Sequence, residues 1–423
     1  MLESAAKLIE AGERADQEEH VNTMLTALSK GDFQQRWELA KQIVKLGESV
    51  VLPLAALIEQ TATSDPDLCW FAARILSEFD HPVAITSLVS LLHVNDEDLN
   101  AIAADALGKL GTSAIVALTQ QLQDPKTRLL TVQAFACIQS AEVIAPLQTV
   151  VNDPQPMVRA MAIKALSNFP DRSIIPLLVA AITDPANMVR REAVIGMGLV
   201  AVRCKQKVEF GLVDYSLDQF ANLLAPLLFD LSIDVAKQAA IALGRVGNDL
   251  AAQKLFQLVQ APQIPELLKI QAIRSLGWIN SSQALAYLGE LINLDSLDLL
   301  DSKQLCHEVI SSIGRIDRPE LIAATADILI AQLRANRPST RQPVIQRQIA
   351  LNLGLLGDQR ALEPLIESLA TSDLSTQLHI IRALKRLNPQ LAHQRLLAIV
   401  EVQDTATALQ AGVAIALREW PHK

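Results

Sequence analysis

The sequence predicts an all-α fold: a right-handed α-solenoid, or superhelix, in which about eleven helical hairpins stack on one another. Three observations support this fold class, and the first is a repeat in the centre of the chain. Two dyads recur there at a spacing of 31 residues: Asp153-Pro154 with Asp184-Pro185, and Val158-Arg159 with Val189-Arg190. A period of this length is typical of stacked-repeat architectures.

The second observation is a recurring glycine element, Leu-Gly-x-Leu-Gly, in which two residues separate the two glycines. Its clear copies are Leu107–Gly111, Leu243–Gly247 and Leu353–Gly357, and weaker copies occupy 276–280 and 313–317. The second glycine fits a helix C-cap, where a positive φ is favourable only without a Cβ. The first glycine lets neighbouring helices approach closely.

The third observation is the composition, with 4% aromatic and 50% hydrophobic residues. Such a core consists mainly of Ala, Leu, Ile and Val, which suits closely packed helices. On this template the Val-Arg helices begin near residues 35, 68, 99, 127, 158, 189, 235, 268, 305, 345 and 376. The intervals after 189, 268 and 305 are longer than the others, so we expect inserts or lengthened helices there.

We therefore predict one continuous solenoid over 31–407, with an N-terminal helical cap over 1–30 and a C-terminal capping helix over 408–423. An insert is expected near 201–220. An extended loop is expected near 334–347, where Pro338 and Pro343 oppose helix formation.

The charge balance limits the possible partners and compartment. The net charge of −9 and the pI of about 5.4 argue against nucleic-acid binding, which needs a basic face. The four cysteines are scattered and form no CxxC pair, which indicates a reducing compartment. The N-terminus lacks the pattern of a signal peptide, and the longest apolar runs are too short to cross a membrane. We expect a cytoplasmic protein without membrane insertion.

These motifs resemble the short HEAT-like repeats of the phycobilisome-lyase type, over roughly residues 31–407. The resemblance suggests a cyanobacterial source. It implies that the Val-Arg helix of each hairpin faces the concave side. It also implies a structural ladder between repeats, in which an Asp lies six residues before each Arg. Asp153 with Arg159 and Asp184 with Arg190 fit this spacing, whereas Arg128 follows Asp124 by only four residues.

Elsewhere the ladder position is occupied by other residue types: Cys69, Asn100, Ala236, Lys269, Cys306, Gln346 and Gln377. We therefore expect the ladder only in the middle of the chain, with packing alone holding the flanks.

The sequence offers no catalytic residue, no metal site and no cofactor. In a di-iron hydroxylase built of similar repeats, the metal site resembles several His-Glu pairs. This chain has only one such pair, His307-Glu308. Adjacent helix positions diverge by about 100°, so Cys306 and His307 are expected as a buried thiol beside an exposed imidazole. A helical-repeat DNA glycosylase needs a basic groove rich in aromatic residues, which this composition excludes.

Candidate partner-binding residues begin with Trp37 and Trp70, which lie 33 residues apart at equivalent positions of successive repeats. Equivalent positions stack, so we expect the two indoles to be neighbours near the concave edge, either as an interface or as filling between repeats. Trp278 and Trp420 are expected to pack internally.

The concave column also contains cationic residues, Arg74 and Arg274, and apolar residues, Ile195 and Ile241. Apolar residues at exposed positions indicate a partner patch, unless the insert after residue 200 covers them.

Both inserts also contain candidates. Cys204 lies between Arg203 and Lys205, a setting that lowers the pKa of an exposed thiol. The second insert carries Arg337 and Arg341, which suit carboxylate, phosphate or sulfate partners, or else belong to a solvated loop.

We predict a non-catalytic scaffold or assembly factor that binds a partner protein on the concave face. Two alternatives follow from the family resemblance. In the first, the chain would be a subunit of a phycobilin lyase or another phycobilisome-related factor that acts with a second protein. In the second, the chain would be the partner of an A-type iron–sulfur cluster carrier. The partner would accordingly be a phycobiliprotein, a lyase subunit or an iron–sulfur carrier.

Overall fold

The computed structural model describes residues 17–205, 215–293, 303–335, 340–371, 373–401 and 406–420. Within these ranges the chain is helical and contains no β-strand, which confirms the all-α fold class. The chain divides into two compact units, Met1–Gly196 and Met197–Lys423. The boundary between them lies within helix α12 (Asn187–Lys205), and each unit is described by itself.

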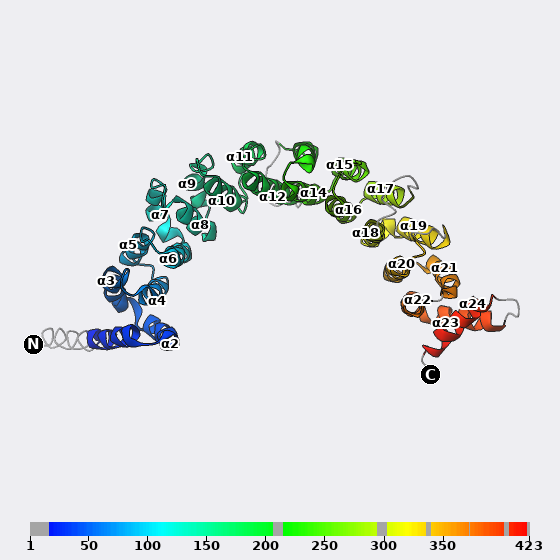
Figure 1. The fold of residues 1–423 in the computed structure, drawn as a ribbon, viewed down its shortest axis with the longest axis horizontal. Helices are drawn as coiled ribbons and strands as arrows, with labels where there is room; N and C mark the ends of the chain where they lie inside the picture. Colours follow the sequence, from blue (N-terminus) through cyan, green and yellow to red (C-terminus); the bar gives the residue numbers. More distant parts are fainter. Residues whose placement is uncertain are drawn as a thin grey trace, which may run out of the picture. The chain divides into compact units, whose positions relative to one another are not determined.

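The first unit consists of two layers of alternating helices (Figure 1). The inner layer contains α2 (Phe33–Ile43), α4 (Pro66–Leu76), α6 (Glu97–Leu110), α8 (Arg128–Cys137) and α10 (Pro156–Leu166). The outer layer contains α3 (Val51–Thr61), α5 (Pro82–Leu91), α7 (Ile115–Gln121), α9 (Ile144–Gln148) and α11 (Ile174–Ala181). A helix that includes 17–30 precedes them. Successive inner helices contact one another from α2 through α10.

The second unit repeats this arrangement (Figure 1). Its inner helices are α14 (Ile233–Val246), α16 (Glu266–Ile279), α18 (Lys303–Ile313), α20 (Pro343–Leu356) and α22 (Leu374–Leu387). Its outer helices are α13 (Leu217–Leu224), α15 (Asp249–Gln260), α17 (Ser282–Asn293), α19 (Ile322–Ala335) and α21 (Leu362–Glu367). At the end of the chain, α23 (Pro389–Glu401) is followed by α24 (Thr407–Arg418), which packs against α22 and α23.

Short 3-10 helices join these elements: η1 (Val44–Val50), η2 (Gly111–Ala114), η3 (Ala141–Val143), η4 (Ala225–Phe229), η5 (Pro319–Leu321), η6 (Gln359–Ala361) and η7 (Ser368–Ala370). One of them, η7, packs against α24, the last helix of the chain. A Cβ added to Gly412 of α24 would lie 2.1 Å from the carbonyl oxygen of Leu369 in η7, so the helix and this backbone are in direct contact.

The eleven predicted Val-Arg helices correspond to α2, α4, α6, α8, α10, α12, α14, α16, α18, α20 and α22, and each begins within two residues of its predicted position. The repeat count is thereby confirmed. Residues with strong local preferences set these starts. In α4, Asp65 accepts a hydrogen bond from the Leu68 N–H as N-cap, and Pro66 occupies the first turn.

The second glycine of the Leu-Gly element ends inner helices, as predicted. Gly111, Gly247 and Gly357 have φ values of 68°, 60° and 75° at the ends of α6, α14 and α20. In the weaker copy at 276–280, Asn280 takes the place of the second glycine and has a φ of 52°. Asn tolerates positive φ better than most residues with a Cβ.

The first glycine brings successive inner helices to backbone contact, also as predicted. A Cβ on Gly354 of α20 would lie 2.9 Å from the Cα of Ala383 in α22. A Cβ on Gly244 of α14 would lie 3.1 Å from the Cβ of Ser275 in α16. The facing residue is small in both cases, so small side chains on both helices fix the spacing between repeats.

Part of the loop expected near 334–347 is helical. Arg334 and Ala335 end α19, and Pro343 begins α20, so 340–342 are the described residues that lie between the two helices. Proline begins a helix readily because the first turn of a helix needs no N–H donor, so Pro343 does not oppose helix formation here. Pro338 and Arg337 lie outside the described residues. Of the insert near 201–220, 201–205 continue α12, and 206–214 also lie outside the described residues.

Glu97–Gln121 is long and apolar enough by composition to cross a membrane. The stretch is not one continuous rod, because the positive φ of Gly111 separates α6 from α7. These two helices lie in different layers of one hairpin (Figure 1), where their apolar residues form core.

Replacing the close-contact glycine should destabilise the second unit. Gly354→Ala places a methyl group against the backbone of α22, and overpacking of this kind costs about 1–3 kcal/mol. The free energy of unfolding, measured with denaturant, should fall by that amount.

Gly289→Ala in α17 is the matched control, since its added Cβ meets only the flexible end of Ile328 at 3.1 Å. Alanine also favours the helix interior by up to about 1 kcal/mol. A Gly354→Ala protein as stable as the Gly289→Ala protein would contradict the close-contact role.

Candidate functional site

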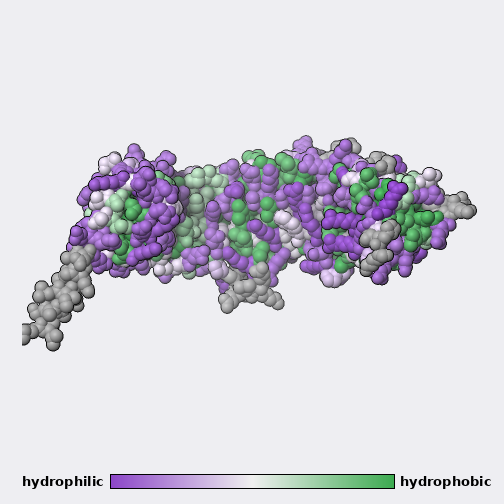
Figure 2. Space-filling view, turned by 90° about the horizontal axis from the view of Figure 1, so that it is seen from below, coloured by the Kyte–Doolittle hydropathy of each residue, from purple (hydrophilic) through white to green (hydrophobic). Residues whose placement is uncertain are grey.

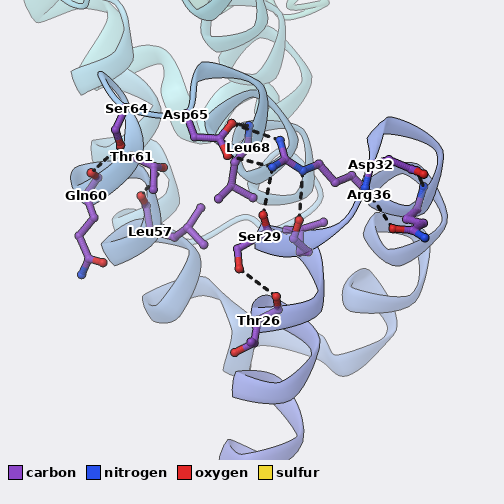
Figure 3. Close-up of polar contacts among 12 residues, drawn as sticks. Thr26, Ser29, Asp32, Arg36, Leu57, Gln60, Thr61, Ser64, Asp65 and Leu68 are labelled. Carbon is purple, nitrogen blue, oxygen red and sulfur yellow. Dashed lines mark hydrogen bonds and ion pairs between the residues drawn. The ribbon is translucent and has the colours of Figure 1, made fainter.

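An ion pair positions the N-terminal end of the inner layer (Figure 3). The Arg36 guanidinium of α2 donates from Nη2 and Nη1 to the two carboxylate oxygens of Asp65, at 2.8 and 3.2 Å. It also donates to the carbonyl oxygens of Leu28 and Ser29, at the end of the helix over 17–30. Since Asp65 caps α4, this one arginine ties the helix over 17–30, α2 and α4 together.

The same contact recurs in the first unit. Arg159 donates from Nε and Nη2 to Asp184 at 2.8 Å, and Arg128 pairs with Asp153. Each arginine therefore reaches the Asp of the following repeat, 25 residues onward. The Asp six residues earlier contributes its backbone instead: the Asp153 carbonyl oxygen accepts from Arg159, and that of Asp184 accepts from Arg190.

The ladder extends further than the sequence predicts. Confinement to the middle of the chain was wrong, because Arg36 and Asp65 form an equivalent rung near the N-terminus. The motif conceals this rung, since Gln35 replaces the usual valine and Lys30 occupies the position six residues before the arginine.

Amide side chains replace arginine in two repeats. Asn100 donates to the carbonyl oxygens of Leu91 and Val94 at 2.8 and 3.0 Å. Gln377 donates to those of Leu369 and Thr371 at 3.1 and 2.7 Å. An amide thus keeps the backbone contacts of its own repeat.

Two tryptophans enclose an arginine on the inner side of α2 and α4. The Arg74 Cζ lies 4.5 Å from the ring centroid of Trp37 and 5.7 Å from that of Trp70. Both indoles are half-buried, whereas Arg74 is exposed. Sequence analysis predicted the two tryptophans as neighbours, and in the structure this guanidinium joins them.

Two phenylalanines complete the cluster. Phe33 is 63% exposed and stacks on Trp37, with ring centroids 6.2 Å apart. Phe71 is buried and makes edge contacts with Trp70 at 5.1 Å and Phe33 at 5.3 Å. We call Phe33, Trp37, Trp70 and Arg74 the N-terminal aromatic surface. Its rings rest on a buried aromatic residue and on helices that the Arg36–Asp65 rung holds in place.

Two hollows adjoin this surface. One, of about 100 Å³, lies beside Trp37 and Arg74. The other, of about 200 Å³, lies between Phe33, Trp70 and the first turns of α4 and α6, and three aspartates line it: Asp67, Asp96 and Asp98. We call the second one the acidic hollow. Its aspartates were missed in the sequence, although Asp67 and Asp98 recur at a spacing of 31 residues, which is a repeat signal.

The remaining predicted residues lie elsewhere. Ile195 and Ile241 are half-buried and belong to different units. Arg274 of α16 pairs with Glu308 of α18 at 2.9 Å, so it joins two inner helices. Arg341 lines an open hollow of about 620 Å³. Figure 2 shows hydrophobic residues in separate patches among hydrophilic ones.

Two tryptophan predictions had different outcomes. Trp420 is 9% exposed and stacks on His393, which confirms internal packing. Trp278 is 56% exposed, so the prediction of packing was wrong. The preceding residue, Gly277, makes the close contact with Ser312 of α18, and a rotation of about 100° per residue turns Trp278 away from that contact.

The thiols are less acidic than the sequence suggests. Burial raises the pKa of Cys69 and Cys306 to about 11, with Asp96 and Asp65 adding to the effect at Cys69. Cys204 is half-buried, so the exposure on which a low pKa depended is not met, and burial raises the pKa of its thiol instead. Cys306 is buried as predicted, but His307 is half-buried. In the described ranges, no three His, Cys, Asp or Glu side chains gather to hold a metal ion.

The family follows from the comparison with known repeats. The HEAT-repeat model matches residues 54–128, 115–198 and 221–303, which is more than half of the chain. This chain is a HEAT-repeat protein. The PBS lyase HEAT-like repeat model matches residues 345–371, in agreement with the repeat type inferred from the sequence. A search of curated proteins finds no match.

Solved HEAT-repeat structures share the fold. Importin beta has a TM-score of 0.57 at 14% identity, over 94% of this chain and 60% of that chain. Kap121p bound to RanGTP has a TM-score of 0.56 at 14% identity, over 95% and 48%. Kap95p in its complex with RanGDP has a TM-score of 0.54 at 13% identity, over 94% and 60%. The HEAT-repeat protein thus spans 60% or less of these relatives, and the likeness shows the fold alone.

Removing the N-terminal rung should destabilise the protein in a pH-dependent way. Arg36→Gln should lower the free energy of unfolding by about 1–3 kcal/mol near pH 7, because charge-assisted hydrogen bonds from a mostly buried guanidinium are lost. The hydrogen bond from Arg36 holds the pKa of Asp65 below its ordinary value of 3.8, against the raising effect of burial. The contribution is therefore complete above that value and is lost as the pH falls through the lower folded pKa.

Denaturant unfolding at a series of pH values checks this. Lys41→Gln is the control, since the Lys41–Glu38 pair is exposed and should contribute less than about 1 kcal/mol. A pH-independent difference between wild type and Arg36→Gln would contradict the assigned role of Asp65.

Alkylation by iodoacetamide checks the thiols. At neutral pH the native protein should leave Cys69 and Cys306 unmodified, and Cys204 should react more slowly than in the unfolded chain, because its thiolate is disfavoured. Mass spectrometry of digests resolves each site. Faster reaction at Cys204 in the folded protein than in the unfolded chain would show an activated thiol instead.

Proposed function

We propose that this HEAT-repeat protein is a non-catalytic scaffold or assembly factor that binds a partner protein through its inner layer, with the N-terminal aromatic surface as the main contact. The observation that carries the proposal is the stack of Trp37, Arg74 and Trp70. Tryptophan and arginine are enriched among the few residues that dominate the energy of interfaces.

The cluster is also pre-organised for binding. Stacking on two indoles restricts the Arg74 side chain before a partner arrives, and Phe71 fixes the rings from below. A partner therefore meets groups that have already lost most of their conformational freedom, which reduces the entropic cost of association. The large exposed fraction of Phe33 leaves apolar area for a partner to bury.

One further observation supports binding of a protein. Kap121p and Kap95p, which share the fold, have Ran bound. The other predicted contacts, Ile195, Ile241, Arg274, Arg337 and Arg341, remain secondary candidates for a longer interface. Ran itself is not proposed as the partner of this chain.

The identity of the partner divides the proposal into three cases. A phycobiliprotein or a second lyase subunit is favoured by the PBS lyase HEAT-like repeat at 345–371. An A-type iron–sulfur cluster carrier is the alternative, and another partner protein is the general case. We propose the cytoplasm as the compartment, in keeping with four cysteines in the free form.

Affinity capture from the native host, followed by mass spectrometry, tests the proposal. The wild-type chain should retain a partner, and the double variant Trp37→Ala with Trp70→Ala should bind it about ten- to a hundredfold more weakly, because the aromatic contacts are removed. Visible-region absorbance of the complex shows whether the partner carries a bilin, an iron–sulfur cluster or neither of these groups.

Trp278→Ala is the matched control, since it removes an exposed indole outside the aromatic surface and should retain full affinity. Circular dichroism reports whether each variant is folded. Unchanged affinity of the folded double variant, together with lower thermal stability, would assign the two indoles to packing and reject this surface as the contact.

A further inference from the structure

The acidic hollow differs from an ordinary gap between helices. Phe33 from α2 and Trp70 from α4 line it, and so do the buried Phe71 and Leu99. Its volume of about 200 Å³ corresponds to roughly six or seven water molecules at ~30 Å³ each. That space admits one long side chain.

The charge around this hollow is unbalanced. Asp96 accepts a hydrogen bond from the Leu99 N–H as N-cap of α6. Asp67 and Asp98 lie in the first turns of α4 and α6, and within the described part of the chain neither forms a hydrogen bond or an ion pair. No basic residue lines the hollow.

Other acidic groups near the aromatic surface have partners. Glu38 pairs with Lys41 at 3.0 Å, and Glu78 pairs with Lys109. Acidic residues in a first helical turn also stabilise the helix dipole, which explains the aspartates as local features. That local explanation does not account for the aromatic residues that line the same hollow.

The lining of the hollow favours one kind of occupant. The face of an indole or a phenyl ring attracts a cation, and the carboxylates that line the same hollow attract it as well. Arg74 shows this attraction between a ring and a cation, since its guanidinium lies against Trp37 and Trp70. An acidic or phosphorylated segment would be repelled by the aspartates.

We infer that the acidic hollow receives a lysine or arginine side chain of the partner, so that the partner docks on the N-terminal aromatic surface through a basic segment. This inference rests on the proposed function and specifies the partner by its charge. The aromatic surface provides apolar contact area, and the hollow selects for the cation.

Fluorescence anisotropy with a labelled tetralysine peptide tests the inference at low and physiological salt. Wild type should bind this peptide at least about tenfold more tightly than its fully Nε-acetylated counterpart, because acetylation removes the charge. The variant Asp67→Asn with Asp98→Asn should lose roughly tenfold in affinity for tetralysine. Both side chains are exposed, so folding should be unaffected.

Asp234→Asn with Glu320→Gln is the charge-matched control. Asp234 occupies the same second position in α14 that Asp67 occupies in α4, and both control residues are exposed. This variant should retain affinity within about twofold, although its net charge equals that of the test variant. Equal losses in both variants would mean non-specific attraction and would overturn the inference.

Equal binding of the acetylated peptide, or unchanged affinity of the Asp67→Asn with Asp98→Asn variant, would also overturn it. These outcomes are separable from failure of the proposed function. Loss of the native partner in the Trp37→Ala with Trp70→Ala variant but not in the aspartate variant retains the aromatic surface and rejects the basic segment. Retention of the partner by the tryptophan variant rejects both.

Discussion

Direct contact between the backbones of successive inner helices is the constraint on which this structure depends. At Gly244, Gly277 and Gly354 a methyl group would lie about 3 Å from the next helix, against Ser275, Ser312 and Ala383. Such close spacing keeps equivalent positions of adjacent repeats in register. Surface side chains at equivalent positions of adjacent repeats then become neighbours, as Trp37 and Trp70 do around Arg74.

The two units add different polar interactions to this packing. In the first, arginine–aspartate rungs couple neighbouring repeats at Asp65, Asp153 and Asp184, and each of these carboxylates also accepts a hydrogen bond from a backbone N–H of its own repeat. In the second, buried neutral groups join adjacent inner helices: Asn352 of α20 donates to the Ile310 carbonyl of α18 at 2.8 Å and accepts from Gln348. Satisfied buried networks of this kind specify a single packing arrangement, because any other leaves polar groups without partners.

Local chemistry determined how much was predictable from the sequence. Helix starts and ends were accessible, since proline, aspartate and glycine impose backbone preferences that depend little on context. The exposure of Trp278 was inaccessible, because packing at the adjacent Gly277 decides it. Burial raises the pKa of Cys204, and burial depends on tertiary packing and not on the adjacent residues of the sequence. The acidic hollow requires first turns from two helices and a ring from a third, so no single repeat contains its pattern.

The reach of the rung arginines has a consequence for how such a protein changes over evolutionary time. Arg128 and Arg159 each contact an aspartate only one repeat away, and each aspartate also accepts a hydrogen bond from the backbone N–H two residues onward in its own repeat. Duplicating or deleting one whole repeat would therefore recreate the same junction at the new neighbour and leave distant junctions intact. The number of repeats is free to vary by recombination, while a partial repeat would strand an arginine or an aspartate at the join.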